Sequence, residues 1–167
     1  PALIKNCIIC YSFSKSLSLP GERIGYLAVS PEIDAYDEVQ PALIVGNRVL
    51  GYVNAPSLFQ LALARCLKEK TDVEAYDKNR KLLYESLTQM GFECVKPQGA
   101  FYLFVKSPQA DEKAFVEHAK KYHLLLVAAS SFGCPGYVRI AYCVSYDMIC
   151  RSLPAFRQLA QDYFGKN

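Results

Sequence analysis

The sequence predicts an α/β fold whose C-terminal part has an α+β arrangement. Two short, unbroken apolar runs at residues 7–11 and 24–29 are typical of strands. After Gly91 the pattern of apolar residues changes to strand, strand, helix, strand, strand, helix. Of the 167 residues, 51% are hydrophobic and 21% are charged, which is typical of a globular chain with one ordinary domain or pieces of two.

The first fifty residues are expected to hold one pair of strands. The runs at 7–11 and 24–29 show no polar alternation, so we expect a sheet that is covered on both faces. Residues 12–23 form the loop between these strands. Residues 31–51 are expected to contain a short helix and an irregular connection.

Two helices are expected in the middle of the chain. Asn54 as N-cap and Pro56 in the first turn predict the start of the first helix. Thr71 and Glu74 have the spacing of a capping box, so a second helix begins there or the first one bends and continues. Gly91 is a suitable residue to end this helical stretch.

The remaining elements follow from the spacing of apolar residues after Gly91. Pro154 is expected to kink or restart the last helix, because proline lacks the N–H that an interior helical bond needs. The strands are expected at 92–96, 100–105, 124–128 and 137–143, and the helices at 111–122 and 146–163.

Composition argues against several classes of protein. The net charge of +3 is spread along the chain, which does not indicate a nucleic-acid partner. No apolar run reaches the ~20 residues that a bilayer span needs. The seven scattered cysteines indicate free thiols in a reducing cytoplasm. Cys7 and Cys10 would point to opposite faces of a strand, and His118 and His123 lack ligand spacing, so no metal site is expected.

The most informative motif follows the first apolar run. Residues 12–15 read SFSK, and Arg23 comes eight positions after Lys15, beyond a Pro-Gly turn. A lysine amine can condense with an aldehyde to a Schiff base, while serine and arginine side chains can hold phosphate oxygens. A cofactor that carries both an aldehyde and a phosphate needs these groups.

The stretch YSFSKSLSLPGERIGYLAVSP resembles the lysine region of the pyridoxal-phosphate-dependent aminotransferases of fold type I, classes I and II. The resemblance implies that Lys15 is the catalytic lysine that binds pyridoxal 5'-phosphate. It also implies that Ser12 and Arg23 bind the cofactor phosphate. The alternative for Lys15 alone is a solvated loop lysine, and the extended match argues against it.

Arg139 lies in a predicted strand with apolar neighbours, where a charge needs a partner. A structural ion pair is one interpretation. The resemblance implies another, because family members bind the substrate α-carboxylate with an arginine in a similar strand. The segments 97–102 and 130–133 are similar to loops that shape the family's substrate pocket, and packing is an equal alternative for their aromatic residues. Asn54 approaches a partner subunit's phosphate site in some relatives, although helix capping is the safer interpretation.

The resemblance covers only the carboxyl-terminal part of the family's chain. It implies three regions: residues 1–50 as a remnant of the large cofactor domain with the end of its sheet, 51–90 as a helical linker between domains, and 91–167 as the small domain. The sequence begins on Pro1, shortly before Lys15. We therefore expect a fragment that lacks half of an active site and is inactive by itself.

The function implied by the resemblance is amino-group transfer between an L-amino acid, for example aspartate, and a 2-oxo acid in amino-acid metabolism and biosynthesis. A cytoplasmic homodimer is expected for the full-length protein. A carbon–sulfur β-lyase or a cyclopropane-forming synthase would share the lysine and both arginines, so the reaction type stays open. A non-catalytic binding or dimerisation module is the alternative from a different class.

Overall fold

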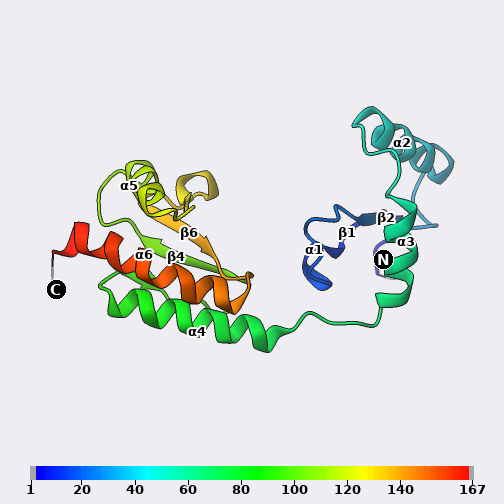
Figure 1. Ribbon diagram of the computed structural model, residues 1–167. Coiled ribbons are helices and arrows are strands. Elements are labelled where there is room, and N and C mark those ends of the chain that lie inside the picture. The colour runs from blue at the N-terminus through cyan, green and yellow to red at the C-terminus, as the bar shows by residue number, and fades with distance from the viewer. Residues whose placement is uncertain (1–2, 166–167) are drawn as a thin grey trace. The chain divides into compact units, whose positions relative to one another are not determined.

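The computed structural model describes residues 3–165 and divides the chain into two compact units, which are described separately. The first unit ends at Thr71 and the second begins at Asp72. The first unit contains a strand hairpin followed by helices (Figure 1). Its elements are β1 (Ile8–Ser12), α1 (Phe13–Ser16), β2 (Gly25–Val29), α2 (Tyr36–Val49) and α3 (Ser57–Cys66).

Strands β1 and β2 pair antiparallel, from Ile8 opposite Val29 to Ser12 opposite Gly25. The pairing confirms the two predicted strands and makes residues 13–24 the connection between them. Gly25 has no space for a side chain, because a Cβ there would lie 2.3 Å from the carbonyl oxygen of Tyr11. The glycine therefore permits the close approach of the two strands where the motif begins.

The cover expected on both faces of this sheet is not present within residues 3–165. Most side chains of β1 and β2 are exposed, including Tyr26 and Leu27. Only the residues that flank β2, Ile24 and Ser30, are buried in this hairpin. An unbroken apolar run indicates a strand, but it does not determine how many layers cover that strand.

Helix α3 begins later than its predicted cap. Its N-cap position is Pro56, without a side-chain hydrogen bond, and Asn54 lies outside the helix. The cause is that a proline disfavours helical geometry in the residue before it, here Ala55. The side-chain amide of Gln60 donates to the Ala55 carbonyl at 2.7 Å and so ties the first turn of α3 to the segment before it.

The second unit is a four-stranded antiparallel sheet with helices packed on it, in the strand order β3-β4-β6-β5. Figure 1 shows α4 and α6 side by side along the sheet. The elements are α4 (Val73–Gln89), β3 (Cys94–Val95), β4 (Tyr102–Lys106), α5 (Glu112–Ala119), the 3-10 helix η1 (Lys120–Tyr122), β5 (Val127–Ala128), the 3-10 helix η2 (Ala129–Phe132), β6 (Tyr137–Ala141) and α6 (Tyr146–Phe164).

The core of this unit lies where α4, α5 and α6 meet β4 and β6. Large apolar side chains from all of these elements are almost completely buried, and aliphatic and aromatic groups of this size supply most of the hydrophobic stabilisation. The most deeply buried are Leu83, Leu87, Leu103, Val105, Phe115, Val138, Tyr142 and Leu159.

Three sequence predictions need correction in this unit. The strands expected at 92–96 and 124–128 shorten to two residues each. The cap of α4 is Asp72, whose carboxylate accepts from the N–H of Ala75 at 2.9 Å, and not Thr71. Helix α6 is continuous through Pro154, so it does not restart there. The α/β fold class itself is confirmed.

Candidate active site

The turn that carries Lys15 is built by the hydroxyl of Ser12, the last residue of β1. This hydroxyl accepts from the N–H of Ser14 at 3.3 Å and donates to the Ser14 hydroxyl at 2.9 Å. Lys15 follows on the short helix α1 and is exposed. The Thr71 hydroxyl binds the carbonyls of Lys15 and Ser16 at 2.9 and 3.0 Å. The turn is therefore fixed from both ends.

Arg23 lies on the returning half of the connection, two residues before the glycine that faces Ser12. Its φ of 52° places a non-glycine residue in the left-handed region, which costs about 1–2 kcal/mol. One guanidinium N–H donates to the Pro20 carbonyl at 2.9 Å. A backbone bond from the Phe13 N–H to the Ile24 carbonyl closes the hairpin behind it. Ser12, Lys15 and Arg23 are thus brought to one end of the hairpin.

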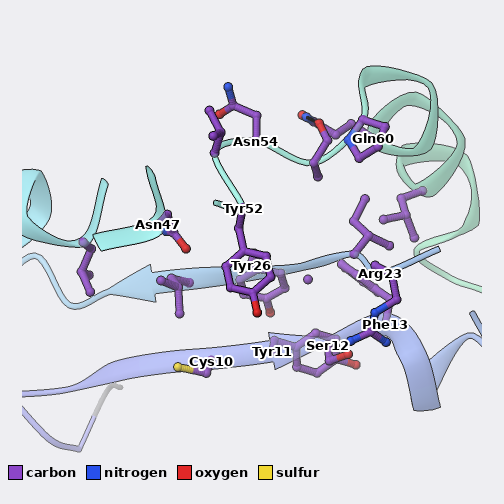
Figure 2. Close-up of a pocket in the computed structure, with 18 of the residues that line it drawn as sticks. Cys10, Tyr11, Ser12, Phe13, Arg23, Tyr26, Asn47, Tyr52, Asn54 and Gln60 are labelled. Atoms are coloured by element: carbon purple, nitrogen blue, oxygen red, sulfur yellow. Dashed lines mark hydrogen bonds between the residues drawn. The ribbon is translucent and has the colours of Figure 1, made fainter. Parts of the chain in front are cut away.

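A cavity of about 1300 Å³ opens on this unit, and Ser12 and Arg23 line it (Figure 2). The rings of Tyr11 and Tyr26 stack at 5.2 Å on its strand side. Asn54, which does not cap a helix, lines the same cavity. The cavity therefore brings a hydroxyl, a guanidinium and a carboxamide to one space.

Arg139 belongs to the second unit, at the centre of β6, where it pairs with Phe104 of β4 and Val127 of β5. Its guanidinium lies between two aromatic rings, 4.2 Å from the centre of Tyr102 and 3.8 Å from that of Phe132. Such cation–π contacts are each worth about 0.5–2 kcal/mol.

The ion pairs found among residues 3–165 do not include Arg139. Within the described chain, its charge is therefore held by two π faces. This arrangement leaves the edge of the guanidinium available for a ligand, and it does not support the interpretation of Arg139 as half of a structural salt bridge.

The loop that carries Phe132 is tied to the buried carboxylate of Glu112, at the start of α5. A hydrogen bond with Ser130 is the main cause that lowers the pKa of this carboxyl below its ordinary value. The N–H of Gly136 also donates to it, at 3.3 Å. Glu112 thus holds both ends of the loop whose ring covers one face of Arg139.

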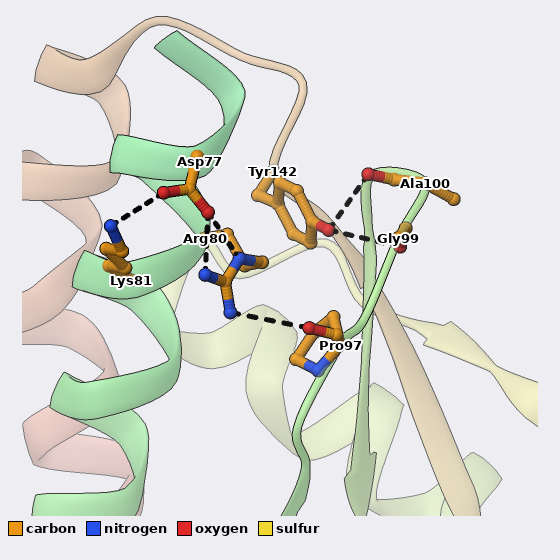
Figure 3. A network of polar contacts seen from close by, with 7 residues as sticks. All are labelled: Asp77, Arg80, Lys81, Pro97, Gly99, Ala100 and Tyr142. Atoms are coloured by element: carbon orange, nitrogen blue, oxygen red, sulfur yellow. Dashed lines mark hydrogen bonds and ion pairs between the residues drawn. The ribbon is translucent and has the colours of Figure 1, made fainter. Parts of the chain in front are cut away.

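A polar network fixes the turn at residues 97–101, which precedes the other ring (Figure 3). Arg80 of α4 pairs with Asp77 and donates to the Pro97 carbonyl at 3.3 Å. The Tyr142 hydroxyl donates to the Ala100 carbonyl at 3.0 Å. Sequence reasoning missed Arg80 and Tyr142, because their partners lie 17 and 42 residues away along the chain.

The histidine and cysteine side chains, which could also carry chemistry, show no arrangement that indicates a second site in the described chain. His118 lies 2.6 Å from a carboxylate oxygen of Asp162, which also accepts from the Tyr122 hydroxyl. All seven cysteines are free. Among residues 3–165 there is no cluster of histidine, cysteine and carboxylate side chains that could hold a metal ion. No helix in the described part of the chain is long and apolar enough to cross a membrane.

Comparison with known proteins agrees with the motif and the fold. The profile of the family described as "Aminotransferase class I and II" matches residues 3–155. The aspartate aminotransferase of Bacillus subtilis is 30% identical over 96% of this chain and 43% of its own length. The aromatic-amino-acid aminotransferase 2 of Thermococcus litoralis is 27% identical over 96% of this chain and 42% of its own.

Solved structures show the same relationship. A crystal structure of an amino transferase from Eubacterium rectale matches with a TM-score of 0.75 and 52% identity, over 95% of this chain and 40% of that one. The aspartate aminotransferase of Thermotoga maritima matches with a TM-score of 0.69 and 28% identity, over 95% and 40%. The chain thus spans about two fifths of the length of these relatives.

These matches confirm a fold of the type I pyridoxal-phosphate enzymes, as the lysine motif predicts. The chain belongs to the class I and II aminotransferase family.

Proposed function

We propose that the complete protein is an amino-acid aminotransferase that uses pyridoxal 5'-phosphate bound to Lys15. The observation that supports this proposal is the cavity at the hairpin end, which Ser12 and Arg23 line, with Lys15 three residues after Ser12 on the exposed helix α1. Family membership supports it, since the relatives named above are aminotransferases.

The donor set on this hairpin fits the chemistry of the cofactor. Arg23 has guanidinium N–H groups besides the one bonded to Pro20, and a guanidinium fork suits phosphate oxygens. Ser12 adds a hydroxyl on the same cavity wall. Lys15 is an exposed residue, and a lysine amine is the group that can bond to an aldehyde. When it is bound, pyridoxal phosphate supplies an electron sink that stabilises negative charge at the substrate Cα.

The residues of the chain then have separate tasks. Lys15, once its amine is free, removes the proton from the substrate Cα and acts as the general base. Ser12 and Arg23 hold the phosphate end in place. Arg139 binds the α-carboxylate, which the amino acid and the 2-oxo acid have in common, through the edge of its guanidinium. Aspartate is a suitable amino-group donor by analogy with the aspartate aminotransferases among the relatives.

We also propose a cytoplasmic homodimer, in which residues 51–90 link the cofactor domain to the small domain. The free cysteines support a reducing compartment. Helices α2 and α3 expose several large apolar side chains, and a soluble monomer rarely exposes so many together. These side chains therefore support the proposal that more protein covers the first unit in the dimer. They include Ile44, Val45, Val49, Leu58 and Leu61.

The lysine assignment is tested by trapping the cofactor. The complete protein is loaded with pyridoxal phosphate, reduced with borohydride to make the lysine linkage permanent, digested and mapped. The label is expected on the peptide that contains Lys15. Lys15→Arg should abolish labelling and turnover, while the exposed control Lys68→Arg should change neither. Labelling of another lysine in the unsubstituted protein would overturn the assignment.

A further inference from the structure

Hydrogen bonds from other parts of the unit to its carbonyl groups hold the turn that leads into β4 (Figure 3). Arg80 binds the Pro97 carbonyl, and the Tyr142 hydroxyl binds that of Ala100. The backbone N–H of Tyr142 also donates, at 3.0 Å, to the Phe101 carbonyl. Tyr142 therefore holds two consecutive carbonyls of the turn, one with its side chain and one with its backbone.

The hydroxyl of Tyr142 has one proton, and its geometry directs that proton to one acceptor. The Ala100 carbonyl is at 3.0 Å, whereas the Gly99 carbonyl, at 3.5 Å, is at the limit of a hydrogen bond. Tyr142 is only 1% exposed. The buried amide of Asn79 fixes the residue from α4, since it donates to the Tyr142 carbonyl at 3.0 Å. Tyr142 is thus a rigid support for the turn.

The turn needs such a support because Ala100 has a φ of 57°. An alanine in the left-handed region is strained, and a strained residue keeps its conformation only where its surroundings hold it. The bond from Tyr142 is accepted by this same residue. Without the hydroxyl, the turn can relax toward an ordinary backbone conformation.

A relaxed turn would affect Arg139 directly. Tyr102, whose ring lies 4.2 Å from the guanidinium, comes two residues after Ala100 and is the first residue of β4. Tyr142 comes three residues after Arg139, just beyond the end of β6. The hydroxyl therefore connects the strand that carries the guanidinium with the turn that places one of its two covering rings.

We propose that Tyr142 is a positioning residue for the substrate α-carboxylate, which acts by holding the 97–101 turn and, through it, the ring of Tyr102 on Arg139. The inference rests on the proposed role of Arg139. It assigns to Tyr142 an effect on the affinity for carboxylate ligands, and no effect on how the cofactor is held.

The test is Tyr142→Phe in the complete, cofactor-loaded protein, since this change removes only the hydroxyl. The matched control is Tyr137→Phe, at the other end of β6. Calorimetry measures the dissociation constant of maleate, a dicarboxylate that does not react. Tyr142→Phe should weaken maleate about three- to tenfold, the range of one neutral hydrogen bond. KM should rise by a similar factor, kcat should stay within about twofold, and Tyr137→Phe should change neither.

A purely structural role for Tyr142 would lower the melting temperature and leave maleate binding unchanged, and that result overturns the inference. If Tyr142→Phe does not fold, Arg80→Met, which has no donor for the Pro97 carbonyl, should also weaken maleate. An unchanged affinity in that variant would then overturn the inference.

Arg139→Ala separates the two proposals. If this variant binds maleate like the unsubstituted protein, the carboxylate role of Arg139 fails, and the inference fails with it. If Arg139→Ala weakens maleate and Tyr142→Phe does not, only the inference about Tyr142 is wrong.

Discussion

Replacement of Gly25 by alanine tests the geometry of the hairpin that carries the candidate cofactor lysine. The added Cβ would lie 2.3 Å from the Tyr11 carbonyl oxygen and 3.3 Å from the Cα of Ser12. Both of these are backbone atoms, which cannot rotate away as a side chain can. To restore a contact of 3.0 Å, the strands would have to move apart by at least about 0.7 Å.

The expected cost follows from this displacement. Overpacking of this kind destabilises a protein by about 1–3 kcal/mol. The clash also lies at the last pair of the ladder, between Gly25 and Ser12, so the residue that caps the Lys15 turn moves first. We therefore expect Gly25→Ala to lower the free energy of unfolding and to weaken retention of pyridoxal phosphate.

Gly21→Ala is the matched control, because a Cβ at Gly21 meets nothing within 4 Å. This change should be neutral or stabilise by about 0.4–1 kcal/mol through the unfolded chain. Urea unfolding of the complete protein measures both free energies, and dialysis followed by absorbance measures the cofactor that remains bound. If Gly25→Ala came within about 0.5 kcal/mol of Gly21→Ala, the close approach of β1 and β2 would be refuted.

Three further predictions follow from single side chains. Arg23→Ala should lower affinity for pyridoxal phosphate by about 1.5–3 kcal/mol, the range of a hydrogen bond to a charged group, as measured by titration of the apoprotein; unchanged affinity would exclude the phosphate role. Asn79→Leu should lower the free energy of unfolding by about 2–4 kcal/mol, because the buried Tyr142 carbonyl and the part-buried Val144 carbonyl lose their donor, and a cost below about 1 kcal/mol would contradict this. The hydrogen bonds from Tyr122 and then His118 lower the pKa of Asp162, so this carboxylate stabilises the fold above about pH 4, and the effect is lost as the pH falls through its folded pKa. The melting temperatures of Asp162→Asn and the unsubstituted protein should therefore differ at pH 6 and converge toward pH 3; a difference that stayed constant with pH would argue against a contribution from this carboxylate.

Sequence patterns were sufficient to predict an element where the residues that determine it are close together in the chain. The two apolar runs predicted the two strands, and the Pro-Gly turn predicted that the segment between them is a loop. The helices at 111–122 and 146–163 were also predicted nearly to their ends, because amphipathic periodicity is a local signal.

Sequence patterns failed where a distant partner or a competing local rule determines where a helix starts or which contact a side chain makes. The prediction of Asn54 as a cap neglected the restriction that Pro56 imposes on the residue before it. The capping-box spacing suggested Thr71, yet Asp72 caps the helix and the Thr71 hydroxyl binds the lysine turn, 55 and 56 residues away. The contact between Tyr142 and the 97–101 turn had no local signal, since a buried tyrosine has the same sequence pattern whether or not its hydroxyl is bonded.

The aromatic rings around Arg139 have a consequence for how the site responds to salt. Tyr102 and Phe132 hold the guanidinium without neutralising it, so an incoming anion does not have to displace a carboxylate that is already bound. Its full positive charge would then attract small inorganic anions as well as substrate. Chloride or sulfate should therefore compete with the carboxylate ligand, and the apparent affinity should fall as ionic strength rises. If Arg139 binds the substrate carboxylate as proposed, the KM measured for the complete protein would therefore depend on the salt in the buffer.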